Sequence, residues 1–109
     1  MLPLHHRLPK QEVSPVLRNG IHVRGAFLEL VYKKTTGKPR FAVIVSTKID
    51  KRAVVRNRAR RLIRESVHHL LSTIVPCDGV CIVRKNMSEL SQVEVQKIIL
   101  ELFTQAHLI

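Results

Sequence analysis

Residues 53–70 read AVVRNRARRLIRESVHHL, and this stretch decides the fold. Its apolar and small residues recur at three- and four-residue spacing, at Val55, Ala59, Leu62, Ile63, Ser66 and Leu70. That spacing places them on one stripe of an α-helix. Asp50 is the predicted N-cap, and Pro76 with Gly79 ends the helix after about Ile74. The pattern therefore predicts a long amphipathic helix that packs on a core.

The segments on either side of this helix have the patterns of β-strands. Residues 41–45, FAVIV, form a continuous apolar run typical of the centre of a sheet. Residues 26–34 alternate with a period of two, and a short strand over 21–24 can precede them. Turn residues 36–39 separate the two longer strands, so we expect these strands to pair as a hairpin. Residues 79–85 predict a further short, buried strand.

Helices are also predicted at both ends of the chain. Residues 8–19 are weakly helical, with Ser14 and Pro15 expected to restart the chain as N-cap and first helical residue. Near the carboxyl end, Ser91 and Glu94 form a capping box in front of an amphipathic helix. This order predicts one α+β domain over residues 1–109, a sandwich of helices on about four mostly antiparallel strands. The long helix and its flanking strands make one strand-helix-strand crossover.

The balance of charge indicates the class of partner. The chain carries 19 Lys and Arg against 8 Asp and Glu, a formal net charge of +11. Such a balance draws a protein to polyanions whatever its fold. Hydrophobic residues make up 45% of the chain and are spread along it, which favours a packed domain over a disordered basic tail. We therefore expect the charge on a folded surface.

Basic residues are densest around the start of the long helix, at Lys48, Lys51, Arg52, Arg56, Arg58, Arg60, Arg61 and Arg64. At about 100° per residue, most of these arginines fan over the side opposite the apolar stripe, with Arg58 at its edge. Arginines four residues apart repel one another by a few tenths of a kcal/mol, a cost that a bound polyanion offsets. The alternative interpretation is the solvated face of an ordinary basic protein.

Residues 53–65, AVVRNRARRLIRE, closely resemble the signature helix of the bacterial ribonuclease P protein family. Flanking positions extend the resemblance to nearly the whole chain: Arg7-Leu8, Val45-Ser46, Lys48, Arg84-Lys85 and 88–91. Membership implies an RNA-binding subunit of an endoribonuclease that assists a catalytic RNA in removing the 5′ leader of precursor tRNA. It also implies a left-handed crossover, against the strong right-handed preference of such units.

The resemblance implies that Arg56, Asn57, Arg58, Arg60, Arg61 and Arg64 contact the catalytic RNA. The density of charge adds Lys51 and Arg52 to the predicted RNA-binding residues. The charge pattern by itself assigns phosphate binding to the same face of the helix. Guanidinium groups suit this task because their planar fork of donors matches phosphate oxygens.

The resemblance also implies a cleft for the leader between the first helix and the sheet, formed by Val13, Leu17, Phe27, Leu30 and Lys48. The family usually places aromatic residues near Val13, Leu17 and Leu30, whereas only Phe27 and Tyr32 remain here. Stacking is worth about 1 to 3 kcal/mol per base, so we expect weaker leader binding.

The protein itself has no predicted catalytic or metal-binding residues. Its acidic residues are scattered and form no cluster that could hold divalent ions. Two cysteines, Cys77 and Cys81, are too few to supply the four ligands of a structural zinc site. Adjacent histidines at 5–6 and 68–69 do not face one another on a helix. The resemblance implies that the RNA subunit binds the Mg²⁺ ions and activates the water.

The sequence also bears on location and partners. It lacks a secretory signal and any run of roughly 20 apolar residues, which indicates a cytoplasmic protein with no membrane contact. The implied partners are the catalytic RNA and precursor tRNA, and no obligate protein partner is evident. A ribosomal or other structural RNA-binding protein is the main alternative. A DNA-binding module lacks a recognisable helix-turn-helix, and a membrane-surface helix would need an apolar face that is committed to the core.

Overall fold

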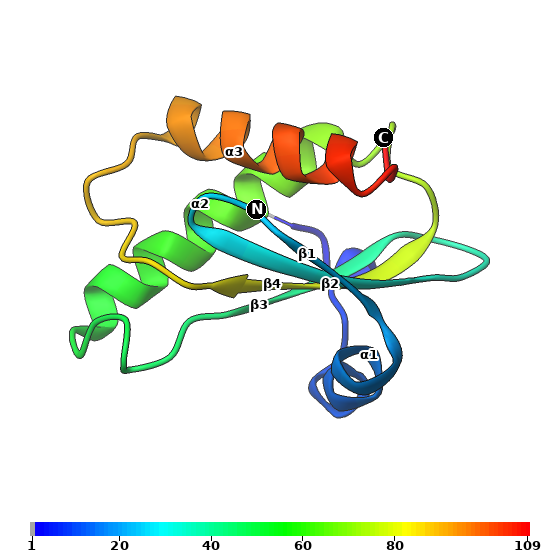
Figure 1. Cartoon of the computed structure of the whole chain (residues 1–109), viewed down its shortest axis with the longest axis horizontal. Coiled ribbons are helices and arrows are strands. Elements are labelled where there is room, and N and C mark those ends of the chain that lie inside the picture. The colour runs from blue at the N-terminus through cyan, green and yellow to red at the C-terminus, as the bar shows by residue number, and fades with distance from the viewer. Residues whose placement is uncertain (1) are drawn as a thin grey trace.

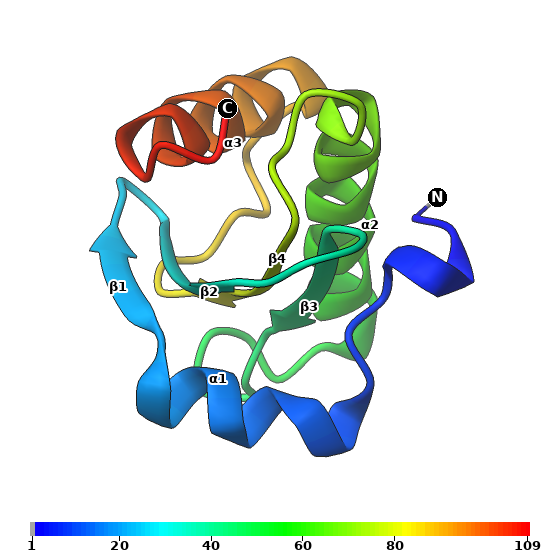
Figure 2. The ribbon, with the colours of Figure 1, turned by 90° about the vertical axis from the view of Figure 1, so that its right-hand side faces the viewer.

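A four-stranded sheet separates two layers of helix in the computed structural model, which describes residues 2–109 (Figure 1). In chain order the elements are η1 (Leu4–His6), η2 (Lys10–Glu12), α1 (Val13–Asn19), β1 (Ile21–Arg24), β2 (Leu28–Lys34), β3 (Arg40–Ile44), α2 (Ala53–Leu70), β4 (Cys77–Val83) and α3 (Gln92–Gln105). Helices α2 and α3 cover one face of the sheet, and α1 lies on the other (Figure 2). The predicted α+β class is confirmed.

The strand order is β1-β2-β4-β3. β2 pairs antiparallel with both β1 and β4, whereas β3 pairs parallel with β4. The predicted hairpin of residues 26–34 with 41–45 is therefore wrong, because β4 lies between those two strands. Val80 and Cys81 of β4 are fully buried, and such a strand is most stable in the interior of a sheet. β3, α2 and β4 form the predicted crossover, whose hand stays a prediction.

Most of the core lies between the sheet and the pair α2 and α3. Leu30, Phe41, Ile63 and Phe103 belong to it, and the rings of Phe41 and Phe103 stack with centroids 5.3 Å apart. A smaller cluster under α1 joins Leu8, Val16, Val31 and Val80. Because β2 and β4 are covered on both faces, each contributes alternate residues to the two clusters.

Two predicted helix starts are shifted by local hydrogen bonding. Helix α2 begins after Arg52, not at Asp50, whose carboxylate accepts from the Arg52 backbone N–H at 2.8 Å. Helix α1 begins at Val13, so Pro15 is its third residue and not its first. Proline is tolerated there because N–H groups of the first turn have no intrahelical acceptor.

Two further helix boundaries differ in how well the sequence predicted them. Helix α2 ends at Leu70, four residues earlier than expected, where the Thr73 hydroxyl donates to the Leu70 carbonyl at 2.8 Å. The capping box of Ser91 and Glu94 at α3 is confirmed in both directions. Within residues 2–109, none of the helices is long and apolar enough to cross a membrane.

Candidate nucleic-acid interface

Helix α2 presents the cationic face because its other side is held by the core. Ala59, Leu62, Ile63, Ser66 and Val67 are buried against the sheet and α3. The Gln92 amide of α3 donates to the Ser66 hydroxyl at 2.9 Å and to the Leu62 carbonyl at 3.1 Å, which fixes the rotation of α2. The remaining sides of the helix therefore carry the arginines.

The loop before α2 gathers three of the predicted RNA-binding residues at the start of the helix. The Asp50 carboxylate accepts from the Arg52 guanidinium at 2.8 Å and from the Asn86 amide at 3.0 Å. These bonds, chiefly the one from the Arg52 side chain, hold the pKa of Asp50 well below its usual value. Arg56 Nη1 donates to the backbone carbonyls of Asp50 at 3.1 Å and Lys51 at 2.8 Å. Lys51, Arg52 and Arg56 thus lie together.

Arg58 has a structural role in this fold. Its guanidinium donates to three backbone carbonyls of the connection between β4 and α3: Met87 at 3.4 Å, Ser88 at 3.3 Å and Leu90 at 2.8 Å. Arg58 therefore positions that connection against α2. Three of its five N–H donors are committed to these carbonyls, so its predicted contact with the catalytic RNA would fall to the remaining two.

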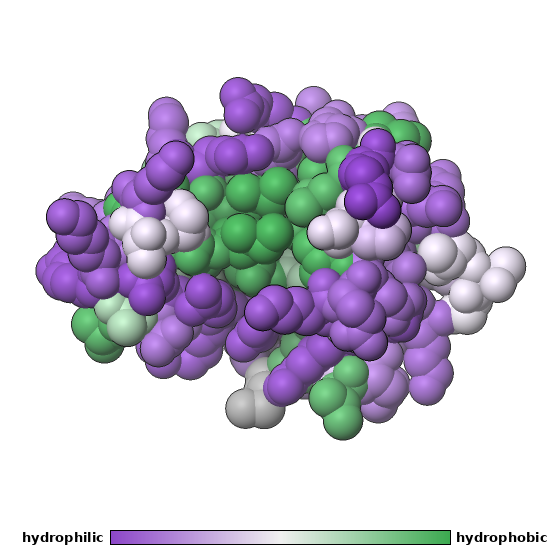
Figure 3. All heavy atoms as spheres, turned by 90° about the horizontal axis from the view of Figure 1, so that it is seen from below, coloured by the Kyte–Doolittle hydropathy of each residue, from purple (hydrophilic) through white to green (hydrophobic). Residues whose placement is uncertain are grey.

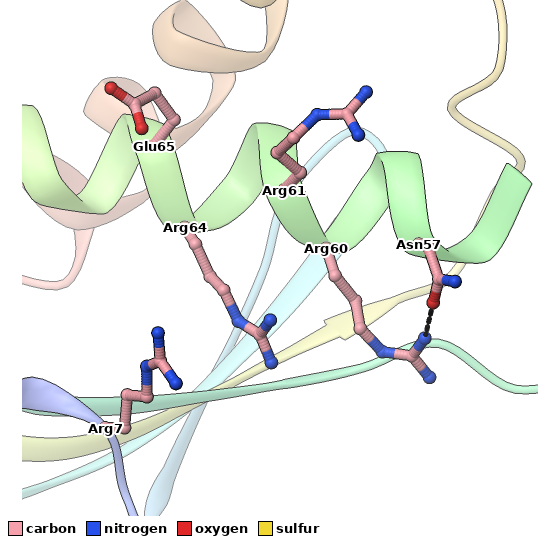
Figure 4. A pocket seen from close by; sticks show the side chains of 6 residues that line it. All are labelled: Arg7, Asn57, Arg60, Arg61, Arg64 and Glu65. Atoms are coloured by element: carbon pink, nitrogen blue, oxygen red, sulfur yellow. Dashed lines mark hydrogen bonds between the residues drawn. The ribbon is translucent and has the colours of Figure 1, made fainter. Parts of the chain in front are cut away.

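Further along α2 lie Arg60, Arg61 and Arg64, which the sequence predicted to fan over the side of the helix opposite its apolar stripe. Arg60 donates to the Asn57 side chain at 2.9 Å and to the Val45 carbonyl at 3.4 Å. Figure 4 shows the heads of Arg60 and Arg64 on one side of the helix, with the head of Arg61 on the other. Arg7, which the prediction did not include, reaches from the amino-terminal segment to a hollow beside the middle of α2 that Arg60, Arg61 and Arg64 also line.

A second hollow, of about 450 Å³, lies between α1 and strand β3. Its lining includes Val13 of α1, Ala42 and Ile44 of β3, and two cations, Arg7 and Arg64. The register places Ile44 beside Ile82 of β4 on the face of the sheet that α1 only partly covers. Seen from that side, an apolar area lies inside a hydrophilic rim (Figure 3). The cationic face of α2 therefore continues into an apolar cleft.

Of the five residues predicted for the cleft, the structure places only some beside it. Val13 and Leu17 pack beside Ala42, Ile44 and Ile82, as expected of residues on α1. The prediction for Leu30 is wrong, because its side chain is fully buried in the core on the opposite face of the sheet. The alternation along β2 places Leu30 on one face with Leu28 and Tyr32, but it could not show that α2 and α3, and not α1, cover that face.

Phe27 and Lys48 lie outside the hollow. Phe27 packs against the main core, with the Lys85 ammonium 6.0 Å from its ring centroid, so it does not line the cleft. Lys48 is exposed in the loop that follows β3. The sequence missed Ala42, Ile44 and Ile82, although alternation along β3 does place Ala42 and Ile44 on one face.

Glu29 of β2 is a buried carboxylate. It accepts from His22 Nδ1 at 2.8 Å and from Arg84 Nε at 2.9 Å, and it pairs in register with Ile82. The hydrogen bonds from His22 and then Arg84 lower the pKa of Glu29 and outweigh its burial. Glu29 thereby fixes the position of Arg84, which follows the end of β4.

The two cysteines have no part in this surface. Cys77 and Cys81 are buried free thiols on β4, and burial raises the pKa of each to about 12. A thiol of this kind is unreactive near neutral pH. Across residues 2–109, no group of three or more His, Cys, Asp or Glu side chains is placed to hold a metal ion.

Comparison with known proteins identifies the family. A family model described as Ribonuclease P matches residues 2–107. The chain belongs to the ribonuclease P protein family. This membership agrees with the resemblance of the α2 sequence, and it favours a ribonuclease P subunit over a ribosomal protein. It also means that the chain acts with an RNA subunit as part of an endoribonuclease.

Curated members of the ribonuclease P protein family align along most of the chain. The Ribonuclease P protein component of Microcystis aeruginosa is 31% identical over 115 residues, covering 99% of this chain and 96% of its own. That of Xylella fastidiosa strain 9a5c is 31% identical over 93 residues, covering 85% of this chain and 69% of its own.

Solved structures of ribonuclease P proteins share the fold. The Staphylococcus aureus RNase P protein superposes with a TM-score of 0.84 at 21% identity, covering 94% of this chain and 96% of its own. The Thermotoga maritima RNase P protein gives a TM-score of 0.81 at 22% identity, covering 91% and 96%. The ribonuclease P fold is thus preserved at an identity this low.

Proposed function

We propose that this protein binds the catalytic RNA of ribonuclease P through α2 and holds the 5′ leader of precursor tRNA in the cleft beside α1. The observation that carries the proposal is the continuity of the two surfaces, since Arg7 and Arg64 line both hollows. A structured RNA bound along α2 would then deliver a single strand into the cleft. We place this activity in the cytoplasm.

The chemistry of the described face suits phosphate groups more than a divalent cation. Two of its carboxylates are paired with arginines, Asp50 with Arg52 and Glu29 with Arg84, and Glu65 lies 3.7 Å from His69 Nε2. The guanidinium heads along α2 offer only donors. We therefore propose that the RNA subunit holds most of the Mg²⁺ ions, which would activate the attacking water, and that cleavage leaves a 5′ phosphate on the tRNA.

In this proposal the protein acts by electrostatics and by positioning. Two RNAs that meet at an active site repel one another through their phosphates, and a cationic surface between them replaces part of the counterion atmosphere. A leader held in a defined place also raises the effective concentration of the scissile bond. Both effects lower the Mg²⁺ concentration that cleavage requires.

The proposal is tested by cleavage of precursor tRNA with a bacterial ribonuclease P RNA over a series of Mg²⁺ concentrations. We expect the folded protein to lower the Mg²⁺ midpoint at least about twofold, because it supplies fixed positive charge. Polylysine of equal total charge is the control and should shift the midpoint less. An unchanged midpoint with folded, RNA-bound protein would reject the proposal.

The apolar cleft carries a second prediction. Val13→Phe places a ring in a cleft that is lined by aliphatic side chains, and base stacking is worth about 1 to 3 kcal/mol. We expect precursor tRNA to bind the holoenzyme about fivefold more tightly, at the low end of that range. The measurement is the dissociation constant for precursor and mature tRNA.

A matched control for this substitution lies on α3. Val93 is 75% exposed and lies outside the cleft, so Val93→Phe should leave both dissociation constants unchanged. An equal gain for mature tRNA, which has no leader, would show that the new ring contacts another part of the RNA. The cleft would then not be the leader site.

A further inference from the structure

The hollow beside the middle of α2 has a volume of about 340 Å³ and is lined by Arg7, Asn57, Arg60, Arg61, Arg64 and Glu65. Figure 4 shows that these side chains divide into two sets. The heads of Arg7, Arg60 and Arg64 lie together below the helix. Those of Arg61 and Glu65 point to its other side, so no carboxylate of the lining enters the space between the three guanidinium groups.

Two of the three arginines are held in place by uncharged acceptors. Arg7 Nε donates to the Leu2 carbonyl at 2.9 Å. Arg60 donates to the Asn57 side-chain oxygen at 2.9 Å, the bond drawn in Figure 4, and to the Val45 carbonyl at 3.4 Å. A neutral acceptor orients a guanidinium group and leaves its charge in place.

The amino-terminal segment that carries Arg7 is itself anchored. Arg7 forms a parallel bridge with Phe41, and the Leu8 N–H donates to the Phe41 carbonyl at 2.9 Å. The segment therefore lies along the free edge of β3, which brings Arg7 opposite a helix that begins 46 positions later in the chain, at Ala53. The three charges are brought together by the fold and not by a helical repeat.

Arg64 lies between the other two and has no hydrogen bond or ion pair within residues 2–109. Partial burial, then the charges of Arg7 and Arg60, lower the pKa of its guanidinium. Arg40, which is also partly buried, has the Asp78 carboxylate as its partner at 3.0 Å, and Arg56 and Arg58 donate to backbone carbonyls. An arginine that is partly buried among like charges is stabilised by an anion between them.

We propose that Arg7, Arg60 and Arg64 form a seat for one phosphodiester group of RNA. Three guanidinium groups around one hollow can donate to both non-bridging oxygens of a phosphate from two directions. The inference rests on the proposed function for the source of the phosphate. It adds Arg7 to the RNA-binding surface and separates Arg64 from Arg61, which faces elsewhere.

The seat is tested with small anions and without RNA. The arginine Nε–Hε signals of the full-length protein are followed by NMR during titration with dimethyl phosphate, a diester, and with inorganic phosphate, against chloride at constant ionic strength. We expect the signals of Arg7, Arg60 and Arg64 to shift together and to saturate with both probes. The exposed Arg18 of α1 serves as the reference signal and should follow ionic strength alone.

Charge-matched variants then locate the site. Arg64→Gln and Arg7→Gln should each weaken dimethyl phosphate binding about tenfold, since each removes a charged donor from the seat. Arg61→Gln removes the same charge from the same helix and should weaken binding less than about twofold, the effect of a general loss of potential. A dispersed amide spectrum shows that each variant is folded.

Two results would overturn the inference. If Arg61→Gln weakens binding as much as Arg64→Gln, the helix attracts anions only by its overall potential. If inorganic phosphate binds and dimethyl phosphate does not, the hollow selects a free or terminal phosphate and not the RNA backbone. Neither result depends on cleavage, so failure of the seat is distinguishable from failure of the proposed function, which the Mg²⁺ series tests.

Discussion

The double substitution of Arg61→Gln with Arg64→Gln is expected to weaken binding of ribonuclease P RNA about a hundredfold in 0.1 M salt. A hydrogen bond to a charged group contributes about 1.5 to 3 kcal/mol, and the two guanidinium heads face opposite sides of α2. The slope of log affinity against log salt concentration should also fall by roughly 0.7 to 0.9 for each lost phosphate contact. Filter binding over a range of salt concentrations measures both quantities.

This pair of substitutions tests RNA binding without a change in folding. Neither guanidinium makes a hydrogen bond or ion pair within residues 2–109, so their removal breaks no contact there, and loss of Arg64 relieves its repulsion by Arg7 and Arg60. Lys38→Gln with Lys97→Gln removes the same charge from the β2–β3 loop and from α3, and should leave the slope almost unchanged. Equal slopes for the two double variants would mean that α2 does not face the RNA.

The sequence was most informative where one element alone carries the pattern. Helix α2 could be predicted because its buried residues keep helical spacing, and α3 because Ser91 and Glu94 cap it within one turn. The α+β class followed from the order of such elements. These features depend on residues at most a few turns apart.

Features that depend on distant residues could not be predicted in this way. The position of β4 between β2 and β3 depends on pairing across the whole sheet, and the alternation along β2 shows which residues share a face but not which helix covers that face. The misplacement of Leu30 has the same cause. Arg7 likewise joins the arginines of α2 only because its backbone pairs with Phe41.

Arg58 has a different role from the other arginines of α2, because it holds backbone carbonyls of the connection between β4 and α3. Its helical position at the edge of the cationic face was predicted, but its partners Met87, Ser88 and Leu90 are about 30 residues further along the chain. Hydrogen-bond partners this distant depend on where the connection from β4 to α3 runs. That path is determined by the sheet and not by the helix.

Arg58→Ala is therefore expected to lower stability more than any other single substitution of an arginine on α2. It leaves three backbone carbonyls without their charged donor, a loss of about 2 kcal/mol, which corresponds to a fall of roughly 8 to 16 °C in Tm for a chain of this size. Thermal unfolding followed by circular dichroism in chloride buffer measures the change. Phosphate is omitted because an anion that binds the native state would mask it.

Two further variants determine whether the loss comes from the carbonyl contacts. Arg58→Lys keeps the charge but cannot span three acceptors with a planar fork, so it should recover less than half of the lost Tm. Arg61→Ala removes an exposed guanidinium from the same helix and should change Tm by only a few degrees. A normal Tm for Arg58→Ala together with a large loss of RNA affinity would show that Arg58 leaves the carbonyls to contact RNA.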